Sequence, residues 1–278
     1  MKIRGILLVL IASLLVILGS VGGYYYYSAQ PNKSTISTEN QSVAPLPIKP
    51  QIVRVTLPGT SPIDALVDDY AQPSSLWVVV NKERPLTDQQ YRPVDLIELT
   101  SVKTRSEKTV DERSLRAVVV SNLEALFADG LVAGYDFMLG SGFRSYDKQV
   151  FYYSNYVAMS GEAAANKYSA KPGYSEHQTG LAFDISLATK ECYLEICFGD
   201  LDAGKWVAQN AKKYGFVVRY PADKVDITGY QYEPWHLRYV GRPLAEALTE
   251  SQLTLDEALP YLEKARLELI ETKKITVQ

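Results

Sequence analysis

The sequence predicts an α+β fold for one large domain that covers residues 52–278. Segments with helical periodicity are mixed with short strand-like segments, and no regular βαβ rhythm connects them. The chain has 278 residues, of which 46% are hydrophobic and 22% charged, so it can bury a substantial core. The composition becomes globular at about Ile52 and stays so. The residues before this point therefore have other roles.

Residues 1–27 read as a membrane anchor or export signal. An apolar run extends from Ile6 to about Gly23, and Lys2 and Arg4 precede it. A run of this length can cross a bilayer as a helix, and the positive charges hold its start in the cytoplasm. We expect a retained single-pass anchor, because no A-x-A cleavage site is evident; a cleaved signal peptide, which would give a secreted protein, is the alternative. Both readings place the remaining chain outside the cytoplasm.

A linker is expected over residues 28–51, which are rich in Ser, Thr, Asn, Gln and Pro and lack aromatic residues. Such a composition cannot bury enough apolar surface to fold, so this stretch is predicted to be a disordered tether. The formal net charge of −3 indicates no nucleic-acid partner. The two cysteines exclude a disulfide-dense miniprotein and a four-cysteine zinc site. The oligomeric state is left open.

Helices and strands can be assigned along the globular part from periodicity and end signals. Helices are expected over residues 114–129, stopped by Gly130, over 146–159, over 203–214, with Gly215 at the end, and from the capping box Thr254-x-x-Glu257 toward residue 274. Strands are expected over residues 77–80, 181–185, 216–220 and 235–240.

Two of these predicted strands carry candidate metal ligands. In residues 181–185 the apolar side chains share one face, so Asp184 points to the other, and His236 opposes the apolar face of residues 235–240 in the same way. If the strands are neighbours, Asp184 and His236 converge, and His177 just before the first strand can fold over them. Two imidazoles and one carboxylate form a ligand set for a tetrahedral zinc ion with an open fourth position. Because metal motifs also occur by chance, the residue types alone leave open that each histidine is an isolated hydrogen-bonded residue.

Glu233 is the candidate general base beside this metal. It precedes His236 by three residues, and a straight strand would place it on the opposite face, about 10 Å away. Pro234 makes a bend plausible, and a bend would bring the carboxylate to the metal-bound water. Glu176 is the next candidate for this role.

Three motifs together resemble a known family. The pattern S-x-H-x-x-G-x-x-x-D begins at Ser175, E-x-W-H begins at Glu233, and S-G-F-R-S precedes both at Ser141. They resemble the VanY-type zinc D,D-carboxypeptidases and their relatives, the L,D-carboxypeptidases of peptidoglycan, over about residues 77–242. The resemblance implies the fold of the hedgehog and D-Ala-D-Ala peptidases, in which a small antiparallel sheet carries the zinc site and helices flank it.

The resemblance also implies roles for individual residues. The zinc ligands fall on His177, Asp184 and His236, and the catalytic base falls on Glu233. Substrate-binding positions fall on Arg144, which matches the arginine that holds the terminal carboxylate, and on Ser175 and Gln149, which match positions that line the substrate site. The role of Arg144 is also reasonable on physical grounds, since a planar guanidinium binds a carboxylate through two parallel hydrogen bonds.

The implied activity is that of a zinc metallocarboxypeptidase, with one Zn²⁺ per chain, that removes the C-terminal D-alanine from peptidoglycan stem peptides. An L,D-carboxypeptidase that trims tetrapeptides to tripeptides is the close alternative. A non-catalytic, zinc-containing peptidoglycan-binding module is an alternative of another class, but it would not need a free Glu233 beside the metal. A serine D,D-peptidase is rejected, because the S-x-x-K match at Ser145 has no accompanying K-T-G.

Cys192 and Cys197 lie in a stretch that is not part of the family pattern and that reads as an inserted loop. In an exported chain they are expected to form a disulfide. The choice between D,D- and L,D-activity depends on the pocket beyond the metal, which we expect Phe143, Tyr174 and this loop to shape.

Overall fold

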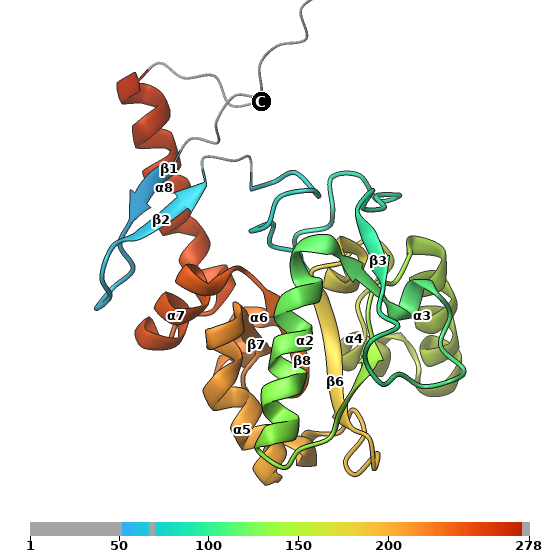
Figure 1. The fold of residues 1–278 in the computed structure, drawn as a ribbon. Helices are drawn as coiled ribbons and strands as arrows, with labels where there is room; N and C mark the ends of the chain where they lie inside the picture. The colour runs from blue at the N-terminus through green and yellow to red at the C-terminus, as the bar shows by residue number, and fades with distance from the viewer. Residues whose placement is uncertain (1–51, 67–69, 274–278) are drawn as a thin grey trace, which may run out of the picture. The chain divides into compact units, whose positions relative to one another are not determined.

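The computed structural model describes residues 52–66 and 70–273 (Figure 1). The anchor and the linker expected over residues 1–51 lie outside the described residues. Among the helices that the structure does describe, none combines the length and the apolar character that crossing a bilayer requires.

A four-stranded antiparallel sheet forms the centre of the domain, which confirms the α+β prediction. Its order is β5-β6-β8-β7, with β5 at Phe137–Ser141, β6 at Ala182–Leu187, β7 at Phe216–Tyr220 and β8 at Glu233–Tyr239. Two small antiparallel pairs lie outside it: β1 (Ile52–Val55) with β2 (Ile63–Leu66), and β3 (Leu96–Glu98) with β4 (Ser114–Arg116).

Helices surround this sheet. They are α2 (Ala117–Val132), α3 (Tyr146–Ser160), α4 (Glu162–Tyr168), α5 (Asp202–Asn210), α6 (Val225–Thr228), α7 (Arg242–Ser251) and α8 (Leu255–Lys273). Short 3₁₀ helices are η1 (Asp111–Arg113), η2 (Glu176–Thr179), η3 (Ile196–Asp200), η4 (Ala211–Tyr214) and η5 (Ala222–Lys224).

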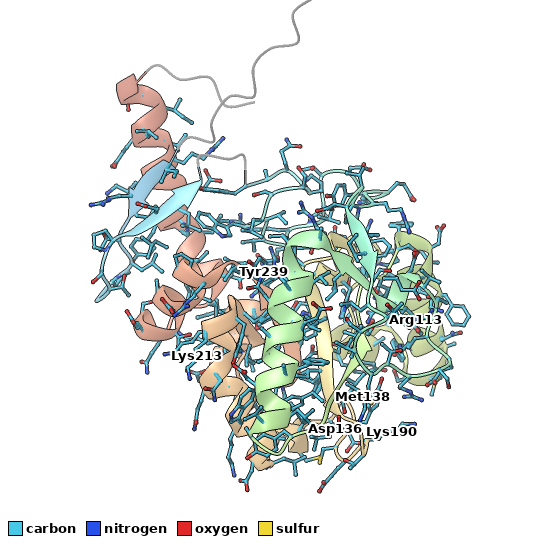
Figure 2. The ribbon with its side chains drawn as sticks, in the orientation of Figure 1. Arg113, Asp136, Met138, Lys190, Lys213 and Tyr239 are labelled. Carbon is cyan, nitrogen blue, oxygen red and sulfur yellow. A yellow bond between two sulfur atoms is a disulfide. The ribbon has the colours of Figure 1, made fainter. Side chains whose placement is uncertain are left out.

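Helix α2 covers one face of the sheet and forms the main core with it (Figure 1). Leu123 of α2 belongs to the same buried cluster as Phe183 of β6 and Leu237 of β8, and all three side chains have no exposed surface. Burying a side chain of this size stabilises the fold by about 1.5–3 kcal/mol. Tyr239, labelled in Figure 2, lies at the end of β8. Its hydroxyl accepts a hydrogen bond from Asn122 of α2 at 3.2 Å. Because neighbouring side chains on a strand alternate, the residues between these apolar ones face away from α2.

A second core joins the N-terminal hairpin to α7 and α8. Trp77 packs there, and its indole N–H donates a hydrogen bond to the carbonyl of Val240 at 2.7 Å. Helix α8 begins at the expected capping box: the backbone N–H of Thr254 donates to Glu257 at 2.8 Å, and that of Glu257 donates to the Thr254 hydroxyl at 3.2 Å.

Three predicted elements differ in the structure. The helix expected over residues 203–214 is divided into α5, which ends at Asn210, and the 3₁₀ helix η4. The helix expected over residues 114–129 begins only at Ala117, because residues 114–116 form β4, and it continues past Gly130 to Val132. A Cβ on Gly130 would lie 2.4 Å from the ring of Phe137, so this glycine permits close packing and does not end the helix.

The strand expected over residues 77–80 is also wrong. This segment is buried, but Trp77 lies in a turn and residues 78–80 belong to no described strand. The guanidinium of Arg238 donates hydrogen bonds to the carbonyls of Leu76 and Val78 at 3.0 and 2.9 Å. An arginine side chain therefore takes the place that a neighbouring strand would occupy.

Candidate active site

Strands β6 and β8 are neighbours, and their register places Asp184 directly opposite His236. Both side chains lie on the face away from α2, and His177 reaches them from η2, immediately before β6. Nε2 of His177 lies 3.5 Å from Oδ2 of Asp184, and Nδ1 of His236 lies 3.3 Å from Oδ1. One ligand atom from each residue lies within 4.8 Å of the others.

The hydrogen bonds of His177 prepare it to bind a metal. Its Nδ1 lies 2.8 Å from the carbonyl oxygen of Gly142, which can only accept, so Nδ1 carries the proton. The lone pair on Nε2 then points toward Asp184. His236 presents Nδ1 to the same carboxylate. Two imidazole nitrogens and one carboxylate oxygen at this spacing fit a zinc ion with an open fourth position.

The electrostatics of the cluster favour a cation. Burial alone would lower the pKa of His236, but its contacts with Asp184 and Glu176 raise it to about 9. Burial and the nearby Arg144 lower the pKa of His177 to about 4. Although burial opposes ionisation, the two histidines hold the pKa of Asp184 well below its usual range. The cluster thus keeps a positive charge beside Asp184, and a metal ion can replace the proton on His236 in that role.

Glu233 shares this face because β8 is irregular. Val218 of β7 pairs with Leu237, but Tyr220 pairs with Glu233, so β8 contains two extra residues over this stretch, which includes Pro234. As a result Oε2 of Glu233 lies 3.7 Å from Nδ1 of His236. Burial, reinforced by the charge of Asp184 and opposed by that of His236, raises the pKa of Glu233 to about 7.

Arg144 approaches the cluster from the loop between β5 and α3. Its Nη2 lies 3.9 Å from Oδ2 of Asp184, and its Nη1 donates to the amide oxygen of Gln149 at 3.0 Å. Its Nη2 also lies 3.4 Å from the Ser141 hydroxyl, and the guanidinium lies 5.3 Å from the ring centre of Tyr152. These contacts orient the guanidinium. Nε of Arg144 is buried and has no hydrogen-bond partner among the described residues.

A cavity of about 270 Å³ opens over these side chains. Arg144, Ser175, His177, Asp184, Glu233 and His236 all line it. Gln149 does not: it is fully buried behind Arg144, and its amide group donates to the carbonyl of Ala170 at 2.7 Å. In the structure Gln149 supports Arg144 and does not face the cavity.

The walls of the cavity differ from those expected. Phe143 is fully buried, and Tyr174 lines a neighbouring cavity of about 180 Å³. The loop between Cys192 and Cys197 does contribute, through Leu194. A disulfide joins Cys192 to Cys197, with their Cα atoms 5.6 Å apart.

Several tyrosines in the wall were not identified from the sequence. Tyr156, Tyr168, Tyr220 and Tyr230 line the cavity. With 20 tyrosines in the chain, residue type alone could not single them out.

Comparisons with known proteins agree with this geometry. The family model described as VanY, D-alanyl-D-alanine carboxypeptidase, matches residues 112–242. The chain is 42% identical over 204 residues to YodJ of Bacillus subtilis (strain 168), which is named as a carboxypeptidase; the match covers 73% of this chain and 72% of YodJ.

Two solved structures are similar as well. The L,D-carboxypeptidase LdcB has a TM-score of 0.63 and 42% identity, over 68% of this chain and 87% of that one. A variant of the vancomycin-resistance D,D-pentapeptidase VanY, in complex with Zn(II), has a TM-score of 0.55 and 29% identity, over 69% of this chain and 99% of that one.

Proposed function

Because this chain belongs to the VanY family of D-alanyl-D-alanine carboxypeptidases, we propose that it removes the C-terminal D-alanine from peptidoglycan stem peptides with the help of one zinc ion. The observation that carries the proposal is one cavity in which a metal-ligand set, a buried carboxylate and an arginine face the same space. A non-catalytic module would not need the buried carboxylate of Glu233 beside the metal.

His177, Asp184 and His236 would hold the zinc ion, since their ligand atoms lie within 4.8 Å of one another. Zinc in such a site lowers the pKa of a bound water to about 7 and polarises a carbonyl group. Both effects suit the hydrolysis of a peptide bond.

Glu233 takes the proton from the attacking water and passes it to the leaving amine. A pKa of about 7 suits this exchange, because both the charged and the neutral form are then accessible near neutral pH. The position of its carboxylate, 3.7 Å from Nδ1 of His236, puts it beside the metal ligands without making it one of the three.

Arg144 binds the terminal carboxylate of the substrate. Gln149 and Tyr152 hold the guanidinium at the edge of the metal cluster. A carboxylate bound there places the last peptide bond of the substrate next to the metal, and this restricts cleavage to the C-terminal residue. Ser175 lines the same cavity and can contribute a hydrogen bond to the peptide.

The sequence supports a further part of the proposal, which concerns location. Residues 1–27 would anchor the chain in the cell membrane and residues 28–51 would tether the domain outside it. Fractionation of cells that express the full chain, followed by protease treatment of intact spheroplasts, tests this. A domain that is protected from the protease would contradict it.

L,D-carboxypeptidase activity is the second candidate, because the chain shares 42% identity with LdcB and 29% with the VanY structure. Both activities use the same ligands, base and arginine. Mass spectrometry of pentapeptide and tetrapeptide muropeptides, digested side by side with and without a zinc chelator, separates them. D,D-activity predicts chelator-sensitive loss of D-alanine from the pentapeptide. If the tetrapeptide is trimmed while the pentapeptide stays intact, the chain is an L,D-carboxypeptidase and the D,D-assignment is wrong.

A further inference from the structure

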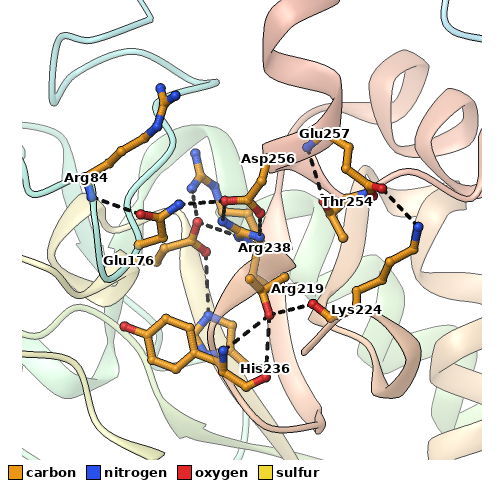
Figure 3. A network of polar contacts seen from close by, with 12 residues as sticks. Arg84, Glu176, Arg219, Lys224, His236, Arg238, Thr254, Asp256 and Glu257 are labelled. Atoms are coloured by element: carbon orange, nitrogen blue, oxygen red, sulfur yellow. Dashed lines mark hydrogen bonds and ion pairs between the residues drawn. The ribbon is translucent and has the colours of Figure 1, made fainter. Parts of the chain in front are cut away.

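A network of buried charges lies next to His236 (Figure 3). It contacts the Nε2 edge of the ring, whereas the Nδ1 edge faces Asp184. At the centre of the network is Glu176 of η2, whose side chain has no exposed surface. Oε1 of Glu176 accepts hydrogen bonds from Nε of Arg219 at 2.7 Å and from Nη1 of Arg238 at 2.8 Å. Both guanidinium groups are also completely buried. One carboxylate oxygen is thus bound by two cations.

Other parts of the chain fix both arginines. Arg219 donates two hydrogen bonds to Asp256, at the start of α8, at 2.5 and 3.2 Å. Asp256 in turn accepts a hydrogen bond from Asn81 at 2.8 Å. Arg238 donates hydrogen bonds to the backbone carbonyls of Leu76 and Val78, which hold its guanidinium in place. With two arginines and two carboxylates, the centre of the network is charge-balanced, and Glu176 is held from several directions.

The second carboxylate oxygen of Glu176, Oε2, does not share the hydrogen bonds of Oε1. Oε2 is buried and has no hydrogen-bond partner among the described residues, and the same is true of Nε2 of His236. These two atoms face each other at 3.7 Å, which is longer than a hydrogen bond. Buried polar atoms without partners are costly, and here one can accept while the other can donate.

The ring of His236 is confined in the remaining directions. Tyr220 and His177 each pack on it with ring centres 4.9 Å away. Its Nδ1 edge faces Asp184, and its Nε2 edge faces the carboxylate of Glu176. The packing thus fixes which nitrogen meets which acid.

We propose that Glu176 is a positioning residue for the metal site: it accepts the Nε2–H proton of His236 and so keeps the lone pair of Nδ1 directed at the metal. Arg219 and Arg238 hold Glu176 in place for this role, and Asp256 links the arrangement to α8. The inference rests on the metal site proposed above. It also assigns Glu176 a role other than that of general base, because two arginines bind one of its oxygens and the other faces an imidazole edge. Carboxylates that accept the outer N–H of a metal-bound histidine fix its tautomer and orientation.

The first test measures zinc affinity by chelator competition on the full chain in detergent. Glu176→Gln should weaken zinc binding about 10- to 100-fold, the usual effect of losing such a partner. Glu257→Gln is the matched control. The same change there removes the negative charge that faces Lys224, in the neighbourhood shown in Figure 3, and keeps an amide oxygen that can accept the capping bond of α8. It touches neither Glu176 nor His236. It should lower the melting temperature and leave the zinc affinity unchanged.

A second test reads the two histidine rings directly. The chain has only two histidines, so ¹⁵N-histidine labelling gives two sets of ring signals. In the zinc-bound wild type, His236 should be protonated at Nε2 and His177 at Nδ1. Glu176→Gln should shift the Nε2–H signal of His236 and leave that of His177, which is bonded to Gly142, in place.

The outcomes are distinguishable. A Glu176→Gln chain that binds zinc as tightly as the wild type, or a wild-type spectrum with His236 protonated at Nδ1, overturns the inference and leaves the proposed function intact. A wild-type chain that binds no zinc overturns both. If Glu176→Gln does not fold, Glu176→Asp, which keeps the charge but shortens the side chain, should show a smaller loss of zinc affinity; an unchanged affinity together with an unshifted His236 signal would count against the role.

Discussion

At the scale of single residues, two carboxylates near His236 differ in their surroundings. Oε1 of Glu176 accepts bonds from two arginines, which, despite the opposing effect of burial, hold its pKa far below the usual range. Glu233 lines the cavity, and burial raises its pKa to about 7. The first is therefore a fixed charge, whereas the second can exchange a proton near neutral pH.

Glu233→Gln should keep bound zinc and a normal melting temperature while kcat falls about 10²- to 10⁴-fold, because the general base is removed. Metal analysis and steady-state kinetics measure the two effects separately. His236→Ala is the comparison, and it should lose the metal as well. A near-normal kcat for Glu233→Gln would show that another group takes the proton.

Arg144→Lys tests recognition of the substrate's terminal carboxylate. The lysine keeps the charge but not the two parallel hydrogen bonds, so kcat/KM should fall about 10- to 100-fold, in line with about 1.5–3 kcal/mol for a charged hydrogen bond. The same peptide with an amidated C-terminus should be a poor substrate for both enzymes, with little difference between them. An equal loss on both peptides would mean that the arginine does not bind the carboxylate.

At the scale of elements, Glu112 connects η1 to α3. Its buried carboxylate accepts hydrogen bonds from the hydroxyl of Tyr152 at 2.6 Å and from Lys108 at 3.1 Å. Burial opposes ionisation, but the bonds from Tyr152, from the backbone of Thr109 and from Lys108 lower the pKa of Glu112 to about 2, from an ordinary value of 4.5. The pKa of Glu112 is thus lower in the folded than in the unfolded chain. Its ionised carboxylate therefore stabilises the folded state fully above about pH 4.5, and this stabilisation is lost as the pH falls toward 2.

Glu112→Gln should therefore lower the free energy of unfolding by about 1–3 kcal/mol at pH 7, and the difference from wild type should shrink below pH 4.5. Urea unfolding at several pH values measures this. Glu250→Gln, at an exposed position of α7, should change little at any of these pH values. A difference that grows as the pH falls would contradict the sign of the shift.

The disulfide loop is the second element with a testable role, because Leu194 lies inside it and lines the cavity. Replacing Cys192 and Cys197 with serine should cost at most ~2–3 kcal/mol of stability, since the closed loop is short. The larger effect should be on KM, with zinc content unchanged. Unfolding curves and kinetics of the double variant measure both, and an unaltered KM would show that the loop does not shape the peptide site.

At the scale of the whole domain, the metal would join η2, β6 and β8, which supply its three ligands. Chelation should abolish activity and lower the melting temperature, and added zinc should restore both. Binding at a free zinc concentration 100 times the Kd stabilises the folded state by about 2.7 kcal/mol. Penicillin should have no effect, because the serine mechanism is absent. Activity that survives exhaustive chelation, or that penicillin removes in a 1:1 ratio, would contradict the zinc mechanism.

The sequence by itself determined the local features. Alternation in residues 181–185 and 235–240 was enough to place Asp184 and His236 opposite the apolar faces, and the Thr254-x-x-Glu257 pattern was enough to locate the start of α8. These features depend on residues a few positions apart, whose relative orientation the backbone geometry sets. The motifs around His177 and Glu233 likewise indicated the family through residue types at fixed spacings.

Only the tertiary structure decided how distant segments meet. It made β6 and β8 neighbours, and it put two extra residues into β8 so that Glu233 joins the face of His236. It also brought Arg219 and Arg238, which follow Glu176 by 43 and 62 residues, onto one oxygen of that carboxylate. Pairings of this kind depend on which packing of the whole chain buries the most apolar surface while satisfying its buried charges, and no local pattern encodes that balance.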